Sequence, residues 1–277
     1  MWSAYEETGR GVRYLYCPYG PVLKNPGANG PLRESLQSLL QEGKDRGQDF
    51  VRLEPGTGLD AKMKDMGAIP SFDGQPQWTT VLDLARPAEE LKHSFTKGHR
   101  SSINGAQRRG LTIRHSTSTE DLALFLSFLE RASKKSRFHG HEQRYYETLI
   151  RTLGPAGIAT IYLAEHEDTP VAAAICLDWA GVRYYAHAAA DPEQPRSLAP
   201  AAPVCWQMIL DAQKNGSHSF DLYGIAPPGA SPTHPWAGFT QFKLAFGGRV
   251  VERGHGWDLP IRKLRHTVYR TMQKLRP

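Results

Sequence analysis

Segments with the period of a β-strand alternate with segments that have the period of an amphipathic helix along almost the whole chain. The run from Leu32 to Lys44 places leucines at helical spacing, and it stands between two strand-like runs, Val12 to Pro18 and Asp49 to Leu53. Such alternation favours an α/β architecture in which helices pack on mixed sheets. With 277 residues, the chain has room for one large domain or two modest ones.

The order of the segments permits two related subdomains, although the sequence contains no long internal repeat. Strand–helix–strand units occur on both sides of Pro76. The second part contains three consecutive strand-like runs, and their short connections suit antiparallel hairpins. These runs are Ile158 to Ala164, Val171 to Trp179 and Val182 to Ala189.

The positive charge is concentrated in two segments. The chain has 34 Lys+Arg against 28 Asp+Glu, a formal net charge of +6. Residues 91–119 carry +6 and residues 249–277 carry another +6, so the remainder sums to −6. We expect the first segment on one helix that opens at Pro87, and the second on a helix from Leu259 onward. Such segments suggest a polyanionic partner or, alternatively, two solvated helix faces.

Several classes of function lack their motifs. The Gly-x-Ser-x-Gly nucleophile elbow and the P-loop are both absent. Cys17, Cys176 and Cys205 are scattered, which indicates reduced thiols rather than a zinc site. His139-Gly140-His141-Glu142 has no second cluster of metal ligands, so no metal is expected. Without a long apolar run or a signal peptide, we expect a cytoplasmic protein with no integral membrane contact.

The order of strands and helices also fits acetyltransferases that use coenzyme A. Those enzymes hold the pyrophosphate with a glycine-rich turn at the start of a helix, where backbone N–H groups are free. The nearest candidate here, Gly105 to Gly110, lies at the end of a predicted helix. We therefore expect no coenzyme A, and no other cofactor is predicted.

The last third of the chain suggests a pocket with one fixed cation. A strand from Phe220 to Ile225 leads into a proline-rich loop, and a short aromatic helix that carries Lys243 follows. Alternatively, Phe239, Phe242 and Phe246 are core residues at helical spacing and Lys243 faces water.

Taken together, these segments resemble the FemABX peptidyltransferases. The motifs that carry the resemblance are Tyr184-Tyr185-Ala186-His187, Leu198-Ala199-Pro200, Phe220 to Ile225, and Phe242-Lys243 before Gly247-Gly248. Tyr19-Gly20-Pro21-Val22 and Gln75-Pro76 agree with the earlier part of the family pattern.

The resemblance covers nearly the whole chain and implies two tandem acetyltransferase-like (GNAT-type) subdomains with mixed sheets. The first would comprise residues 1–75 and 250–277, and the second residues 76–249. It also implies transfer of an amino acid from aminoacyl-tRNA to the amine of a peptide acceptor such as a peptidoglycan precursor, without metal or ATP. This chemistry requires an oxyanion stabiliser and a proton path to the departing ribose hydroxyl.

The resemblance further implies roles for individual residues. Lys243 would contact the tRNA 3′ end and stabilise developing negative charge. Glu54 would orient or deprotonate the acceptor amine, or it is a structural surface carboxylate. Phe242, Tyr185, His187 and Tyr145 would line the cleft, and Arg100, Arg108 and Arg109 would contact tRNA phosphates.

One departure from the family pattern concerns the acceptor. His141 stands where relatives that bind a UDP-linked precursor carry an arginine ahead of Tyr145, although Arg137 or Arg144 could substitute. The usual lysine near the N-terminus has no clear counterpart, and the first subdomain looks shortened. Two alternatives therefore stay open: the same chemistry on a peptide intermediate of a peptide or nucleoside antibiotic, and a non-catalytic RNA-binding protein.

Overall fold

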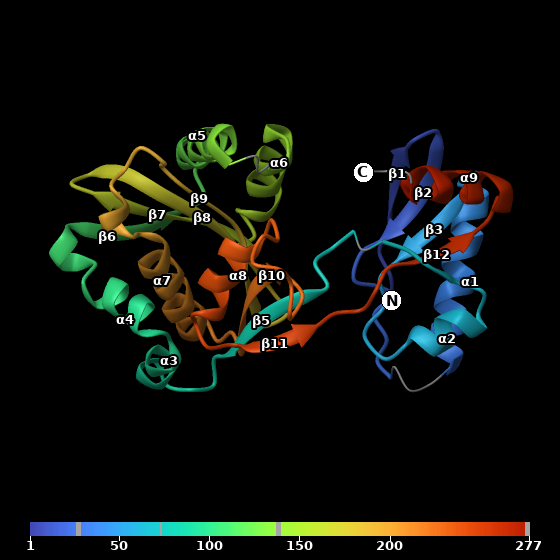
Figure 1. Ribbon diagram of the computed structural model, residues 1–277, viewed down its shortest axis with the longest axis horizontal. Coiled ribbons are helices and arrows are strands. Elements are labelled where there is room, and N and C mark those ends of the chain that lie inside the picture. The colour runs from blue at the N-terminus through green and yellow to red at the C-terminus, as the bar shows by residue number, and fades with distance from the viewer. Residues whose placement is uncertain (26–28, 73, 137–139, 275–277) are drawn as a thin grey trace. The chain divides into compact units, whose positions relative to one another are not determined.

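The computed structural model describes residues 1–25, 29–72, 74–136 and 140–274 (Figure 1). It divides the chain into two compact units. Unit 1 comprises Met1–Trp78 and Glu252–Pro277, and unit 2 comprises Thr79–Val251. Each unit packs helices on a mixed sheet, so the predicted α/β class is confirmed.

Unit 1 contains a five-stranded sheet with helices on both faces. In spatial order its strands are β1 (Tyr5–Gly9), β2 (Val12–Cys17), β3 (Phe50–Leu53), β12 (Trp257–Pro260) and β4 (Ile69–Pro70). Its helices are α1 (Asn29–Asp45), α2 (Asp60–Asp65) and α9 (Lys263–Lys274). Strand residues alternate between the two faces. Leu15 and Val51 join the core beneath α1 and α2, whereas Tyr14 and Phe50 pack against Tyr269 of α9.

The end of the chain differs from the sequence-based expectation. We predicted a helix from Leu259, but residues 257–260 form an inner strand of the sheet, and α9 begins only at Lys263. Trp257 and Leu259 are buried in the core that contains α1. Asp258 points to the opposite face and forms an ion pair with Arg52. Such alternation between two faces is typical of a strand. The sequence-based prediction assigned residues 259 and 260 to the basic helix that follows and therefore missed the strand.

Unit 2 contains a seven-stranded sheet. In spatial order its strands are β11 (Arg249–Glu252), β5 (Trp78–Asp83), β10 (Ser219–Ile225), β9 (Val182–Ala190), β8 (Thr169–Trp179), β7 (Ala159–His166) and β6 (Leu111–Ser116). The four strands β6 to β9 are antiparallel neighbours. The pairs β7–β8 and β8–β9 confirm the two predicted hairpins. By contrast, β10 runs parallel to β9.

Helices cover both faces of this sheet (Figure 1). On one face lie α5 (Thr119–Ser136) and α6 (Gln143–Leu153), which pack against Ala173 and Ile175 of β8. On the other lie α3 (Ala88–Ser94), α4 (Lys97–Asn104) and α7 (Ala201–Lys214), which pack against Ala174 and Cys176. The short helix α8 (Ala237–Leu244) packs beside β10.

The first basic segment does not lie on one continuous helix. Phe95 and Thr96 have extended backbone angles that separate α3 from α4. The Phe95 ring is buried against Trp206 and Phe246, and the Thr96 amide donates to the carbonyl of Ala245. Burial of an aromatic ring thus interrupts the helix that the sequence pattern predicted.

Candidate functional site

The strands β9 and β10 of unit 2 separate partway along their length. Their pairing runs from Ser219 opposite Val182 to Asp221 opposite Tyr184. On the other side of β9, a register shift sets His187 opposite Ile175 but Tyr185 opposite Cys176, so Ala186 is an extra, bulged residue. A bulge bends its strand and re-aims the side chains around it. The residues of β10 after Asp221 therefore no longer pair with β9, and β10 contacts α8.

The backbone of β10 turns locally at Tyr223, and a buried carboxylate stabilises this turn. Asp221 Oδ1 accepts a hydrogen bond of 2.7 Å from the Tyr223 amide and another from the Thr79 hydroxyl. Tyr223 has φ +63°, a left-handed conformation that bulky side chains rarely adopt. Such a backbone persists only where its surroundings hold it, and residues of this kind cluster at functional sites.

Lys243 reaches this turn from α8. Its Nζ donates a hydrogen bond of 2.7 Å to the carbonyl oxygen of Gly224, directly after Tyr223. Burial lowers the pKa of Lys243 to about 8, although the charge of Asp221 acts in the opposite direction. The half-buried lysine thus points its ammonium inward, so the alternative in which it simply faces water is wrong.

The aromatic residues of α8 and of the segment directly after it have different environments. Phe246 is fully buried, Phe242 is half-buried and Phe239 is 48% exposed, so only the first is a core residue. The Phe242 ring lies 6.3 Å from that of the buried Tyr185, and its carbonyl oxygen is 3.0 Å from His99 Nε2. Phe242 and Tyr185 are therefore close together, and Tyr185 belongs to the buried core of unit 2. Their predicted role in lining a cleft stays a prediction.

A cluster of imidazole and phenol groups lies where α6 meets β9. The Tyr145 hydroxyl is 3.3 Å from His187 Nε2, and the His141 ring stacks on the Tyr145 ring at 4.1 Å. Burial, together with the neighbouring His141, lowers the pKa of His187 to about 4. His187 is therefore neutral at physiological pH. Burial and the nearby Tyr223 raise the pKa of Tyr145 to about 12. Since Tyr223 directly precedes Gly224, which accepts the hydrogen bond of Lys243, the cluster lies near the lysine-binding turn.

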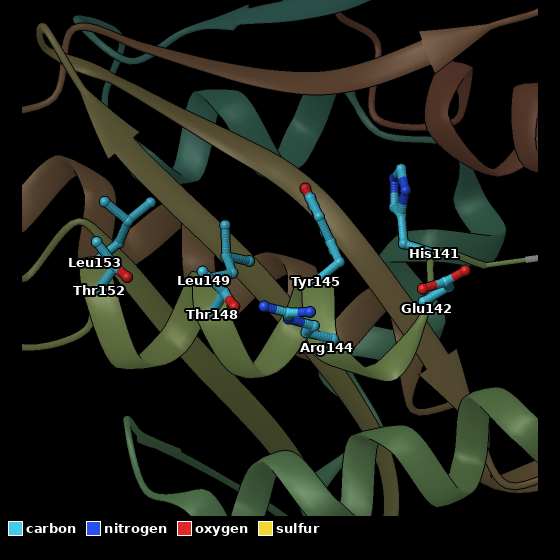
Figure 2. A pocket seen from close by; sticks show the side chains of 8 residues that line it. All are labelled: His141, Glu142, Arg144, Tyr145, Thr148, Leu149, Thr152 and Leu153. Atoms are coloured by element: carbon cyan, nitrogen blue, oxygen red, sulfur yellow. The ribbon is translucent and has the colours of Figure 1, made fainter. Parts of the chain in front are cut away.

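A groove of about 610 Å³ runs along α6 from this cluster (Figure 2). Figure 2 shows the side chains of Tyr145, Leu149 and Leu153 on one side of the helix, as their spacing of four residues requires. His141 lies just before α6 and stacks on Tyr145. Arg144 also lines the groove, together with Glu142. Arg137, the other predicted substitute for the family's arginine, lies outside the described residues, as does His139.

Glu54 belongs to unit 1, directly after β3, and it is 2% exposed. The alternative that it is a surface carboxylate is therefore wrong. Its Oε1 accepts hydrogen bonds from the amides of Gly74, at 2.6 Å, and Gln75, at 2.9 Å. Within the described residues, Oε2 and the buried Tyr16 hydroxyl lack hydrogen-bond partners. Burial and the charge of Glu54 raise the pKa of Tyr16.

The predicted tRNA-binding arginines differ in their contacts. Arg108 is exposed. Arg100 donates to the carbonyl oxygens of His93 and Phe95, and Arg109 donates to those of Ser102 and Leu198. These bonds to neutral carbonyls fix the side chains but leave their positive charge uncompensated.

Two other cations of the same segment are paired with acids. Arg114 forms ion pairs with Asp121 and Glu165, and Lys92 with Glu89. The positive surface of this segment is therefore confined to α4 and the 3₁₀ turn Gln107–Arg109, a smaller area than the sequence suggested.

Four other features bear on the expectations from the sequence. The glycine-rich run 105–110 lies at helix ends, with Gly105 at the C-cap of α4 and Gly110 at that of the following turn. All three cysteines are buried free thiols. The described part of the chain contains no group of three potential metal ligands, and none of its helices is long and apolar enough to span a membrane.

Comparison with known proteins identifies the class of this fold. A model of the acetyltransferase (GNAT) domain matches residues 93–234. The chain also aligns with a solved structure of FemX (TM-score 0.82, 16% identity, 96% of this chain and 90% of that one). A tandem GNAT protein from the clavulanic acid biosynthesis pathway aligns less closely (TM-score 0.58, 15% identity, 94% and 78%). The protein thus has a tandem GNAT fold.

Relatives in sequence narrow the class. A lipid II:glycine glycyltransferase of Staphylococcus epidermidis is 26% identical over 157 residues, which is 50% of this chain and 38% of the relative. Aminoacyltransferase FemA of the same species is 31% identical over 81 residues, 29% of this chain and 19% of the relative. The aligned region therefore spans well under half the length of these relatives. The chain belongs to the family of the acetyltransferase (GNAT) domain, and its relatives support the predicted membership of the FemABX family.

Proposed function

We propose that this protein transfers an amino acid from aminoacyl-tRNA to the amine of a peptide, forming a peptide bond. The amine nitrogen attacks the ester carbonyl carbon, the ester C–O bond breaks, and the proton lost by the amine leaves with the ribose hydroxyl. The observation that carries the proposal is the Lys243 ammonium, held against Gly224 O beside the strained Tyr223. A fixed cation in a partly desolvated site stabilises the developing oxyanion.

The charge on α4 supports a nucleic-acid donor. Arg100 and Arg109 are fixed by carbonyl groups and keep their charge, and Arg108 is exposed beside them. Cations placed in this way neutralise phosphates, and binding of this kind weakens steeply with salt. Since charged tRNA is a cytoplasmic substrate, we place the reaction in the cytoplasm.

Glu54 is the proposed partner of the acceptor amine. Its Oε2 can still accept a hydrogen bond, and the Tyr16 hydroxyl beside it can accept another. An acceptor ammonium supplies three donors, which would satisfy both groups before it loses its proton. The buried position of the carboxylate strengthens such a contact.

Incubation with a mixture of charged tRNAs and candidate acceptors tests the proposal directly. We expect product formation that disappears after RNase treatment, and a product that is unchanged by RNase would contradict the tRNA donor. The names of the relatives point to lipid II or another peptidoglycan precursor as acceptor. Comparing the transfer rates to lipid II, to the UDP-linked precursor and to the free peptide distinguishes a peptidoglycan acceptor from a peptide intermediate of an antibiotic. A thermal shift with coenzyme A would instead favour an acetyltransferase.

The transfer rate should depend on pH through Lys243. Because the pKa of Lys243 is about 8 and its active form is the ammonium, we expect the rate at saturating substrate to fall as the pH rises above about 8. Deprotonation of the acceptor amine would raise the rate over the same range, so it cannot cause the fall. Lys243→Arg keeps the charge at high pH and should remove the alkaline decline. A decline that persists in this variant would assign it to another group.

The Tyr145–His187 contact should affect acceptor binding. We expect Tyr145→Phe and His187→Phe each to raise the acceptor KM about two- to tenfold, the range for one lost hydrogen bond. If the two groups act as a pair, the double variant should show little more than one single effect. Fully additive effects would show that the contact does not mediate acceptor binding.

A further inference from the structure

The C-terminal helix α9 of unit 1 exposes an apolar stripe. Leu264 is 79% exposed, Val268 52% and Met272 45%. Residues four apart lie along one side of a helix, so these three form a continuous row. The side that faces the sheet carries the buried His266 and Tyr269 instead. The helix is thus anchored by one face and presents apolar side chains on another.

Basic residues flank this apolar stripe, and no acidic residue lies near them in the sequence. Residues 259–277 contain no Asp or Glu. Lys263 is exposed next to Leu264. Arg262 and Arg265 share one carboxylate, that of the buried Asp49, at 3.2 and 3.3 Å. Arg270 donates to the neutral carbonyl of Pro70. The surface around the stripe therefore keeps a net positive charge.

We propose that this face of α9 binds the surface of a bilayer that contains anionic phospholipids. An anchored amphipathic helix with exposed apolar residues and basic flanks can lie in the interface, with its apolar side chains among the acyl chains and its cations at the headgroups. RNA would use the cations alone, because Leu264, Val268 and Met272 offer nothing to a phosphate backbone. The row of apolar side chains is thus what favours a lipid surface.

The first test is flotation of the full-length protein with phosphatidylcholine vesicles, with and without phosphatidylglycerol. We expect binding only to the vesicles that contain phosphatidylglycerol, and weaker binding at high salt. Replacing Leu264, Val268 and Met272 together by Ser should lower the partition coefficient about tenfold or more. The matched control is Trp179→Ser, which removes a side chain of 67% exposure from unit 2 and should leave binding unchanged.

Two further variants complete the test. Lys263→Gln should weaken vesicle binding and reduce its dependence on salt. All substituted side chains are exposed, so an unchanged Tm should confirm the fold of each variant. Absence of vesicle binding, or binding that the triple variant retains, would overturn the proposal. Binding of RNA that depends on Lys263 but not on the apolar row would identify this face as an RNA surface and would likewise overturn it. None of these measurements depends on transferase activity.

Discussion

Lys243→Met should lower the turnover of amino-acid transfer about 100-fold or more while leaving the protein folded. The substitution keeps a long, unbranched side chain but removes the charge that lies 2.7 Å from Gly224 O. Loss of one contact that stabilises an oxyanion usually costs this much, because the contact acts mainly in the transition state. Single-turnover transfer from a radiolabelled aminoacyl-tRNA measures the effect on the chemical step.

The design of this experiment separates catalysis from folding and from tRNA binding. Lys214→Met is the matched control, because Lys214 is an exposed lysine in the last turn of α7 and should not affect turnover. Lys243→Arg retains a cation and should keep more activity than the methionine variant. A folded Lys243→Met protein with turnover close to that of the wild type would contradict the catalytic role. It would favour the alternative of a non-catalytic RNA-binding protein, provided that tRNA binding persists.

The site illustrates what a motif can and cannot predict. The Phe-Lys pair and the preceding strand marked Lys243, and the pattern correctly placed a short aromatic helix near it. The sequence did not reveal that Asp221 fixes the turn or that Tyr223 has a positive φ. Both residues lie in the motif from Phe220 to Ile225. We recognised this motif in the sequence but predicted no role for either residue. Their roles depend on hydrogen bonds that periodicity does not encode.

The basic segments show a second limit. Counting charges along the chain treated all cations of residues 91–119 as equivalent, yet Arg114 is paired with Asp121 and Glu165. Glu165 is 51 residues away in sequence and adjacent only because β6 pairs with β7. Similarly, the position of Phe95 in the core interrupts a helix that has a good local pattern. Long-range packing, rather than local propensity, decided both outcomes.

Unit 1 depends on a contact that no local pattern predicts. Arg52 donates two hydrogen bonds to the carboxylate of Asp258, at 2.8 and 2.9 Å, and these residues are 206 positions apart. His266 Nε2 lies 2.9 Å from the same carboxylate. All three side chains are almost completely buried. Burial alone would raise the pKa of Asp258, but the hydrogen bonds of His266 and Arg52 outweigh burial and lower it.

Asp258→Asn should therefore destabilise unit 1 by about 3–5 kcal/mol, because it leaves the guanidinium of Arg52 buried without a countercharge. Hydrogen exchange of the β3 and β12 amides measures the loss. The control is Asp65→Asn, which replaces an exposed carboxylate on α2.

The stability of the wild type should also depend on pH through Asp258. The folded pKa of Asp258 is depressed, so the wild type should keep this stabilisation above the unfolded pKa of about 4 and lose it as the pH falls through the folded pKa. Replacing the pair by apolar residues, with Arg52→Met and Asp258→Leu together, should recover part of the stability, because neither charge of the ion pair then remains buried. The recovery should be incomplete, because Nε2 of the buried His266 loses the carboxylate beside it. Equal protection in Asp258→Asn and Asp65→Asn would show that the ion pair does not hold β12 to β3, and that packing of Trp257 and Leu259 against α1 suffices.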